Sequence, residues 1–346
     1  MAIRVLIVDD SATARAVIRE ILEQAPDIEV VAVAPDAYVA RDKVVQLKPD
    51  VICLDVEMPR MDGITFLRKL MQHMPTPVVM VSSLTRKGAQ VTLDALEAGA
   101  IDYVAKPHSY IYDGGAEIAK ELIEKVRAAA KANVQHRTST TPAKPVAYTA
   151  LAETTQKLIA IGASTGGTEA IKEVLTRMPR NSPGIIIVQH MPASFTGPFA
   201  QRLDTLCEID VREAKDGDSI SIGQALIAPG DYHMALRRSG ARYYVELGGG
   251  DKVSGHRPSV DVMFNSVAKN AGANAVGVIL TGMGADGAKG MLHMRQAGAR
   301  TIAQDEKSCV VFGMPKVAIE LGGAERIVPL ENIPQTTLLM INEMAR

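Results

Sequence analysis

The feature that most limits how this 346-residue chain can fold is a regular alternation of short β-branched runs with stretches of helical periodicity. The runs of the first half are Ile3–Val8, Ile28–Ala34, Val51–Leu54, Pro77–Val81 and Ile101–Val104. The runs of the second half are Leu158–Ile161, Gly184–Val188, Ala225–Ala228, Ala275–Leu280 and Thr301–Ala303. Such alternation predicts doubly wound, mainly parallel α/β sheets, with functional groups at the carboxyl ends of the strands.

A break in this alternation divides the chain. Helical periodicity runs from about Gly115 and then stops, and the segment QHRTSTTPAKPVAYTALAETTQ that follows is rich in Thr, Ala and Pro. A composition of this kind without an apolar period is typical of a linker. The length also exceeds what a single hydrophobic core usually serves. We therefore predict an N-terminal domain at 1–130, a linker at 131–156 and a C-terminal domain at 157–346.

Charge and composition exclude several classes of function. The formal net charge is −1, which argues against nucleic acid as a partner because phosphate binding needs a basic surplus. The sequence contains no helix-turn-helix signature and no run near the ~20 apolar residues of a membrane span, and we expect no secretory leader. Three scattered cysteines without a CxxC pair fit a reducing compartment. We expect a cytoplasmic protein that does not insert into membranes.

Polar groups follow four of the strands expected in the first domain, namely Asp9, Asp10, Asp55, Ser82 and Lys106. If these strand ends converge, three carboxylates share one site, which is tolerable when a hard cation such as Mg²⁺ neutralises them. A carboxylate beside Mg²⁺ and a lysine can attack a phosphoryl group and hold it as an acyl phosphate. Each aspartate alone is as simply explained as a helix cap, but the full set favours a phosphoacceptor site.

The segments VLIVDDS, CLDVEMPRMDG, VMVSS and VAKP resemble the receiver domain of two-component response regulators over about residues 1–128. The resemblance implies a flavodoxin-like fold with strand order 2-1-3-4-5. The roles that it implies are Asp55 as phosphoacceptor, Asp9, Asp10, Asp55 and the Glu57 backbone carbonyl as Mg²⁺ ligands, Ser82 as switch hydroxyl and Lys106 as phosphate partner.

A glycine-rich turn in the second domain matches a dinucleotide-binding fingerprint. The segment AVGVILTGMGADGAKGM contains Gly282-x-Gly284-x-x-Gly287, and Asp305 lies beyond it after another β-like run. Two features count against a cofactor: the motif comes late in the domain, and Asp286 would repel a pyrophosphate at the helix N-terminus. A dehydrogenase remains an alternative.

A second turn, in LIAIGASTGGTEAI, fits the pattern G-x-S-x-G around Ser164. Glycines on both sides of the serine permit a tight strand-to-helix turn that exposes its hydroxyl. The motif alone also suits glycine-rich packing or a phosphate cradle. A nucleophilic serine needs a base, and the base needs a group that orients it.

The other strand ends offer these two partners. His190 directly follows the run GIIIVQ, and Asp286 follows AVGVIL on a glycine loop that permits close approach, which favours it over Asp305. Since all three groups leave the carboxyl ends of strands, one crevice can hold Ser164, His190 and Asp286. The sequence does not establish that they touch. Their order differs from that of α/β-hydrolases, but triads recur on unrelated folds in different orders.

The glycine loops also offer backbone N–H groups, at Met283 and near Thr165, to a developing oxyanion. Two of the remaining histidines, His233 and His256, lie in predicted loops where they can contact a substrate. His293 lies within the helix predicted after Gly287 and is expected to be a surface or packing residue.

The segments IGASTGGTEAI, VQHMPASFT, HRPSVDVMF, ILTGMGADGAKGM and AQDEKSCVVFGMPKVAI resemble the catalytic domain of the chemotaxis receptor methylesterases over nearly all of 157–346. The resemblance implies a Rossmann-like hydrolase domain with Ser164 as nucleophile, His190 as base, Asp286 as orienter and the Met283 N–H in the oxyanion hole. It also implies hydrolysis of glutamyl methyl esters and deamidation of glutamines on methyl-accepting chemoreceptors.

The same resemblance implies a chemotaxis histidine autokinase as phosphodonor, Mg²⁺ at the receiver site and no cofactor for ester hydrolysis. We expect the receiver to inhibit the catalytic crevice until Asp55 is phosphorylated. The alternative from another class is a binding module, in which the receiver is joined to an inert domain that signals through contacts alone.

Overall fold

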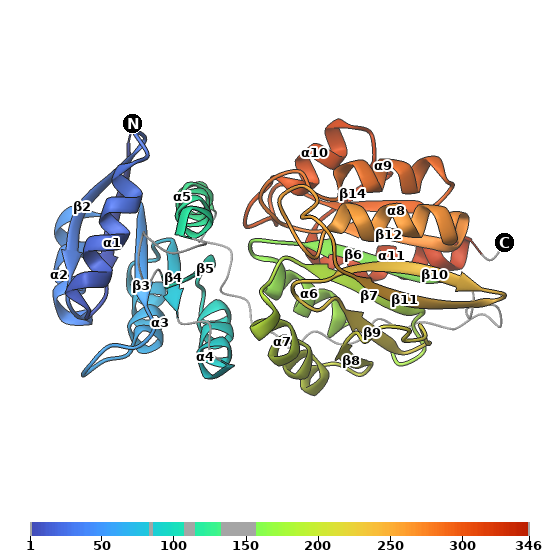
Figure 1. Cartoon of the computed structure of the whole chain (residues 1–346), viewed down its shortest axis with the longest axis horizontal. Helices are drawn as coiled ribbons and strands as arrows, with labels where there is room; N and C mark the ends of the chain where they lie inside the picture. The colour runs from blue at the N-terminus through green and yellow to red at the C-terminus, as the bar shows by residue number, and fades with distance from the viewer. Residues whose placement is uncertain (1, 83–85, 107–114, 133–156, 345–346) are drawn as a thin grey trace. The chain divides into compact units, whose positions relative to one another are not determined.

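In the computed structural model the chain forms two compact α/β units, residues 1–139 and 140–346 (Figure 1). The structure describes residues 2–82, 86–106, 115–132 and 157–344. The predicted linker at 131–156 falls almost wholly outside these residues, so the predicted domain boundaries stay a prediction. Within the described part of the chain, no helix is both long and apolar enough to cross a membrane.

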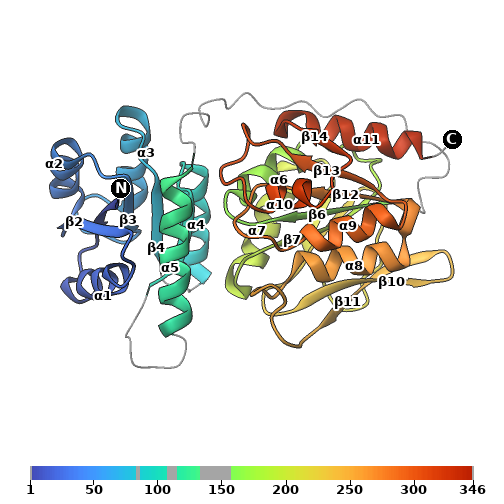
Figure 2. The same cartoon turned by 90° about the horizontal axis from the view of Figure 1, so that it is seen from above.

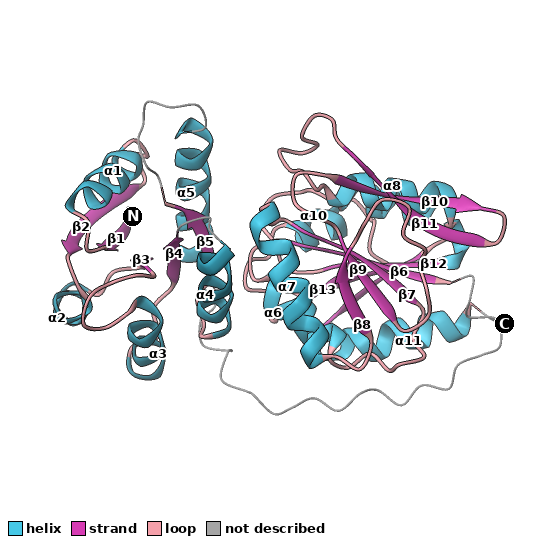
Figure 3. Ribbon diagram, turned by 60° about the horizontal axis from the view of Figure 1, so that its bottom comes forward, coloured by secondary structure: helices cyan, strands magenta, loops and turns pink. Residues whose placement is uncertain are grey.

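The first unit is a five-stranded parallel sheet with the order β2-β1-β3-β4-β5. Its strands are β1 (Ile3–Val8), β2 (Ile28–Ala34), β3 (Val51–Asp55), β4 (Val78–Ser82) and β5 (Asp102–Ala105). Its helices are α1 (Ala12–Glu23), α2 (Ala37–Leu47), α3 (Gly63–His73), α4 (Arg86–Glu97) and α5 (Gly115–Ala130). Helices α1 and α5 pack together on one face, and α3 and α4 on the other (Figure 3). The 2-1-3-4-5 order is confirmed.

The second unit is a seven-stranded parallel sheet with the order β14-β13-β12-β6-β7-β9-β8, together with an antiparallel hairpin, β10-β11. Its strands are β6 (Leu158–Ala163), β7 (Gly184–Gln189), β8 (Asp210–Glu213), β9 (Gln224–Ile227), β10 (His233–Ser239), β11 (Arg242–Gly248), β12 (Ala275–Ile279), β13 (Arg300–Gln304) and β14 (Arg326–Val328). Its helices are α6 (Gly167–Leu175), α7 (Ala193–Leu206), α8 (Val260–Asn270), α9 (Ala288–Gln296), α10 (Met314–Glu320) and α11 (Ile333–Glu343), with short 3₁₀ turns η2 (Gly272–Asn274) and η3 (Leu330–Asn332).

The layers of the second unit follow from this topology. Helices α6 and α11 contact each other on one face of the sheet, while α8 and α9 pack together on the other (Figure 2). The hairpin β10-β11 lies outside the sheet, against α8. Strands β6, β7 and β12 are buried along their whole length. This burial on both faces explains why they read as continuous apolar runs in the sequence.

Six of the seven strands, β9-β7-β6-β12-β13-β14, have the order of a Rossmann fold, and β8 is added at the edge. The strand order reverses between β6 and β12, and ligands of open α/β sheets bind at such a switch point. The predicted fold class is confirmed. Strands β8, β10, β11 and β14 were not among the predicted runs.

Candidate active site

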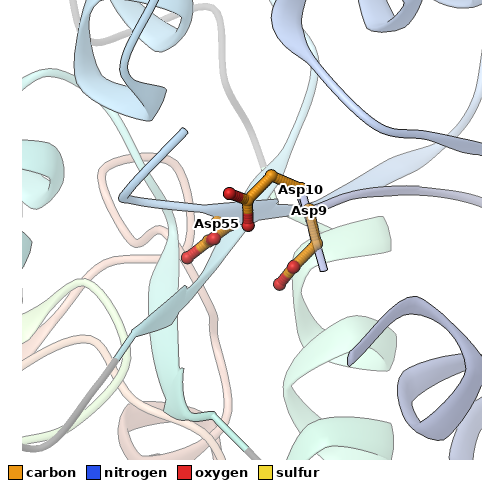
Figure 4. A group of neighbouring side chains, drawn as sticks. All are labelled: Asp9, Asp10 and Asp55. Carbon is orange, nitrogen blue, oxygen red and sulfur yellow. The ribbon is translucent and has the colours of Figure 1, made fainter. Parts of the chain in front are cut away.

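Three carboxylates gather where β1 and β3 end. Oxygen atoms of Asp9, Asp10 and Asp55 all lie within 4.8 Å of one another (Figure 4). Asp9 and Asp55 are buried, and Asp10 is exposed. The three side chains form what we call the acidic cluster. Its all-oxygen donor set and open side suit a hard cation such as Mg²⁺.

Lys106 is the cation that the chain itself brings to the acidic cluster. Its Nζ lies 2.8 Å from Oδ2 of Asp9 and 2.9 Å from Oδ2 of Asp55. Burial, together with repulsion from Asp9, still raises the pKa of Asp55 to about 6 against the attraction of Lys106. Burial disfavours the ammonium of Lys106, but the two carboxylates outweigh it and raise its pKa. The single charge of Lys106 therefore neutralises the two buried carboxylates, Asp9 and Asp55, only in part.

The other residues expected at this site lie nearby in the fold. Ser82 ends β4, and its Oγ accepts a hydrogen bond of 2.8 Å from the Thr92 hydroxyl. Glu57 lies two residues beyond Asp55, and its backbone N–H donates to Asp55 Oδ1 at 3.4 Å. These positions agree with a shared site, while the individual roles stay predictions.

Ser164 lies in the turn between β6 and α6, where the sheet reverses its order. Its N–H donates to the Thr281 carbonyl at 3.1 Å, and its own carbonyl accepts from Gly167 at 2.7 Å. Gly166 follows with φ 75°, and a Cβ there would lie 2.6 Å from the Val310 side chain. Only glycine fits this left-handed and crowded position without strain. The turn leaves the Ser164 side chain partly exposed.

His190 directly follows β7, and its imidazole reaches both other candidates. Its Nδ1 lies 3.2 Å from Ser164 Oγ, and its Nε2 lies 2.8 Å from Asp286 Oδ2. With the proton on Nε2, the ring donates to Asp286 and leaves the Nδ1 lone pair facing the serine hydroxyl. The rival carboxylate, Asp305, instead accepts hydrogen bonds from the hydroxyl and the N–H of Ser308.

Asp286 is buried and accepts four hydrogen bonds. Besides His190, its donors are the Ser259 hydroxyl at 2.8 Å, the Val260 N–H at 2.7 Å and the Asp261 N–H at 3.0 Å. Burial raises the pKa of Asp286, but His190 and these donors outweigh it, so the pKa is lowered. The amino end of α8 thus holds this carboxylate ionised and fixed in place.

The turn at 282–284 lies directly beside the serine. A Cβ at Gly282 would lie 2.8 Å from Ser164 Cβ and 2.3 Å from Met314 Sδ, so only glycine permits this approach. The next residue is Met283, whose N–H is hydrogen-bonded to no other described residue. Thr165 is buried, and its carbonyl accepts from the Thr281 hydroxyl at 3.0 Å. A donor at Met283 next to the nucleophile suits an oxyanion hole.

Known proteins are similar to this chain over nearly its whole length. A sequence model described as CheB methylesterase matches residues 159–337, and one described as response regulator receiver domain matches residues 5–110. The protein-glutamate methylesterase/protein-glutamine glutaminase of Sulfurimonas denitrificans is 64% identical over 99% of both chains. A similarly described protein of Syntrophus aciditrophicus is 58% identical over 98% of this chain and 99% of its own.

The chain belongs to the CheB methylesterase family. The solved catalytic domain of Thermotoga maritima CheB matches it with a TM-score of 0.52 at 40% identity, over 53% of this chain and 98% of that one. The chain is thus a methylesterase of two-component chemotaxis signalling that carries a receiver domain. Membership of the CheB family decides against both alternatives, the dehydrogenase and the inert binding module.

Two features of this CheB-family site escaped the sequence analysis. The segment HRPSVDVMF carried the resemblance, but nothing in it indicated that Ser259 and the first residues of α8 bind Asp286. The structure also corrects the expectation for His233, which is not a loop residue but the buried first residue of β10. His293 is exposed on α9 and bonded to Asn265, as expected of a surface residue.

Proposed function

We propose that this chain is a phosphorylation-regulated serine esterase that hydrolyses glutamyl methyl esters on chemoreceptors and deamidates receptor glutamines. The observation that carries the proposal is the continuous line of hydrogen bonds from Ser164 through His190 to Asp286. The names of the relatives support the substrate classes, because they describe protein-glutamate methylesterases and protein-glutamine glutaminases.

The reaction begins when the Ser164 hydroxyl attacks the carbonyl carbon of the ester. Nδ1 of His190 takes the hydroxyl proton, while Asp286 holds the other ring nitrogen and stabilises the imidazolium. The N–H groups of Met283 and Thr165 donate to the oxyanion of the tetrahedral intermediate. The C–O bond to the methoxy group breaks, and methanol leaves with the proton from His190.

Water completes the cycle without a cofactor. His190 removes a proton from a water molecule as it attacks the acyl-enzyme. The second tetrahedral intermediate then collapses, His190 returns the proton to the leaving Ser164 oxygen, and the glutamyl acid is released. For a glutamine substrate the same steps release ammonia in place of methanol.

The receiver supplies control in this proposal. The acidic cluster and the Glu57 backbone carbonyl would hold Mg²⁺, which neutralises the carboxylates and the charge of a transferred phosphoryl group. A histidine autokinase donates that group to the Asp55 carboxylate. Lys106 and Ser82 contact its oxygens, which changes the surface of the receiver. The unphosphorylated receiver blocks access of the bulky receptor to Ser164, and phosphorylation relieves the block.

Replacement of the nucleophile tests the catalytic part of this proposal. Full-length Ser164→Ala should lose at least about 10³-fold in methanol release from methylated receptors, because triads without their nucleophile keep only residual activity. Ser239→Ala, at an exposed serine of the same unit, should behave as the wild type. Near-normal hydrolysis by Ser164→Ala would exclude Ser164 as the nucleophile.

A fragment that begins at Gln156 tests whether the receiver inhibits the catalytic domain. Because it lacks the receiver, it should demethylate receptors faster than the unphosphorylated full-length protein. An inhibited state favoured by a few kcal/mol suffices for such a switch. A fragment slower than the full-length protein, with and without phosphorylation, would make the receiver an activator or a docking arm.

A further inference from the structure

A second imidazole covers one face of the His190 ring. The rings of His256 and His190 are stacked, with centroids 3.7 Å apart and an angle of 11° between their planes. The His190 side chain is only 8% exposed, although it must exchange protons with substrate and water. The remaining edges of the ring face Ser164 and Asp286. His256 therefore contacts a face of the His190 ring, whereas Ser164 and Asp286 contact its edges.

His256 lies in a segment whose backbone forms a hydrogen-bonded turn. We call residues 251–259 the strap. Within it the N–H and carbonyl of Val253 and His256 bond reciprocally, both at 3.0 Å. Between them, Ser254 and Gly255 have φ values of 53° and 83°, as in the tight turns that join hairpin strands. The turn thus fixes the backbone from which the His256 side chain extends.

His233 fastens both ends of the strap. It is buried, its Nε2 donates to the Asp251 carbonyl at 2.9 Å, and its Nδ1 accepts from the Ser259 N–H at 3.2 Å. One nitrogen donates and the other accepts, so the bonds require a neutral ring with the proton on Nε2. Ser259 in turn donates its hydroxyl to Asp286. One imidazole thus ties the strap to the residue that supports the catalytic carboxylate.

The His190 ring needs such support for a physical reason. Rotation about χ2 of histidine is soft, so the His190 ring can tilt even with hydrogen bonds at both nitrogens. A tilt that carries Nδ1 away from Ser164 Oγ by about 1 Å can cost up to 10²-fold in rate. A flat partner in contact with the face opposes that tilt.

We propose that His256 is a positioning residue for ester hydrolysis, which stacks on His190 and keeps its imidazole aligned between Ser164 and Asp286, and that His233 holds the strap that presents it. The inference rests on the proposed function, because it takes His190 as the general base. It adds two histidines, His256 and His233, to the three residues of the line of hydrogen bonds.

Two variants of the full-length protein at one position test the stacking role. His256→Ala removes the flat partner and should lower kcat about 10- to 100-fold, with KM within about twofold of the wild type. His256→Phe restores a flat ring without ring nitrogens and should recover kcat to within about threefold. The proton NMR signal of the His190 N–H donated to Asp286 should shift or broaden in His256→Ala and return in His256→Phe. His293→Ala is the matched control at an exposed histidine.

The outcomes separate this inference from the proposed function. If Ser164→Ala is inactive but His256→Ala keeps the kcat and the NMR signal of the wild type, the positioning role is wrong and the esterase mechanism stands. If Ser164→Ala is active, the mechanism itself fails. A raised KM with unchanged kcat in both His256 variants would make His256 a substrate contact. Equal loss of kcat in His256→Phe and His256→Ala would show that a ring nitrogen, not stacking, matters.

His233→Phe tests the fastening of the strap. It keeps an aromatic ring at a buried position but removes both hydrogen bonds, so we expect a roughly tenfold loss of kcat and a broadened His190 signal. Far-ultraviolet circular dichroism and the thermal midpoint establish that the variant is folded. A folded His233→Phe with the kcat and the His190 signal of the wild type would overturn this part of the inference.

Discussion

Asp55 of the acidic cluster and Asp286 of the Ser164 site are both buried carboxylates, one at the end of β3 and one in the loop after β12, yet their pKa values are shifted in opposite directions. Burial raises the pKa of Asp55 to about 6, because only the Lys106 ammonium and one long hydrogen bond from the Glu57 N–H stabilise its charged form. Asp286 has four donors, and its pKa is lowered. The number of donors, more than the depth of burial, separates the two.

The number of hydrogen-bond partners thus decides which task each carboxylate can perform. An under-compensated carboxylate keeps lone pairs for a cation and for a phosphoryl group, so it can react. A carboxylate with every oxygen occupied cannot react, but it orients a neighbouring imidazole and stabilises its charge. Four experiments test this contrast between a reactive and an orienting carboxylate.

The first concerns the reactive carboxylate. Asp55→Asn should abolish phosphoryl uptake from a small-molecule phosphodonor, because an amide is no nucleophile. The wild type should take up the label only with Mg²⁺ present, as followed by mass spectrometry. Labelling without metal, or labelling that survives in Asp55→Asn, would show that the acidic cluster is not the phosphoacceptor site.

The second concerns the orienting carboxylate. Asp286→Asn should lower kcat by about 10³–10⁴-fold, because the amide no longer holds the productive His190 tautomer. Asp305→Asn is the control, since Asp305 contacts Ser308 and not the imidazole. Methanol release measures both variants. Equal losses in the two would mean that the site depends on the wider loop structure and not on Asp286 itself.

The third prediction concerns one of the four groups that donate hydrogen bonds to Asp286. Ser259→Ala takes away a hydroxyl that donates to Asp286 and also caps α8 through the Val262 N–H. We expect a loss of about 1 kcal/mol in stability and of roughly tenfold in kcat, since the carboxylate gains freedom to move. Denaturant unfolding and steady-state kinetics measure the two effects. Full activity would show that the backbone donors alone suffice.

The fourth compares Asp286 with its neighbour Asp261. Burial, with repulsion from Asp286, raises the pKa of Asp261 despite the hydrogen bond that it accepts from Gly290 at 2.7 Å. An acid with a raised pKa favours the folded state at low pH. That contribution is lost as the pH rises from the unfolded value of about 3.9 through the folded pKa.

Asp261→Asn should therefore gain stability relative to the wild type as the pH rises through that window. Asp286→Asn should lose stability relative to the wild type as the pH rises from the lowered folded pKa of Asp286 to the unfolded value of about 3.9, which lies below the window of Asp261. Unfolding midpoints in urea at several pH values measure both. The same sign for the two variants would contradict the contrast between the carboxylates.

The sequence predicted the parts of the fold whose signal is local. Buried parallel strands such as β6 and β7 are continuous apolar runs, and their first residues were predicted correctly. Ser164 and His190 directly follow such strands and Asp286 lies in the loop after β12, so topology predicted that one crevice could hold all three. The hairpin β10-β11 was missed because charged residues such as Arg237 and Glu246, paired across its partly exposed strands, interrupt any apolar run.

The donors to Asp286 were missed for another reason. The N–H groups of Val260 and Asp261 are backbone atoms, which any residue type supplies, so no letter of the sequence marks them. The sequence also gives no sign that His256 stacks on His190, because the stack depends on the path of the strap in space. Sequence patterns identify groups by side-chain chemistry, and support by the backbone becomes visible only in three dimensions.

The reversal of strand order between β6 and β12 also governs when the enzyme becomes active during folding. Leu158 of β6 pairs with Ala275 of β12, although most of the second unit lies between them in the chain. Closing a loop of that length is slow compared with the formation of local helices. Ser164 and Asp286 meet only after that closure, so a nascent chain with β6, β7 and their helices already in place still lacks a working esterase. The catalytic residues therefore come together only through a long-range pairing of the domain.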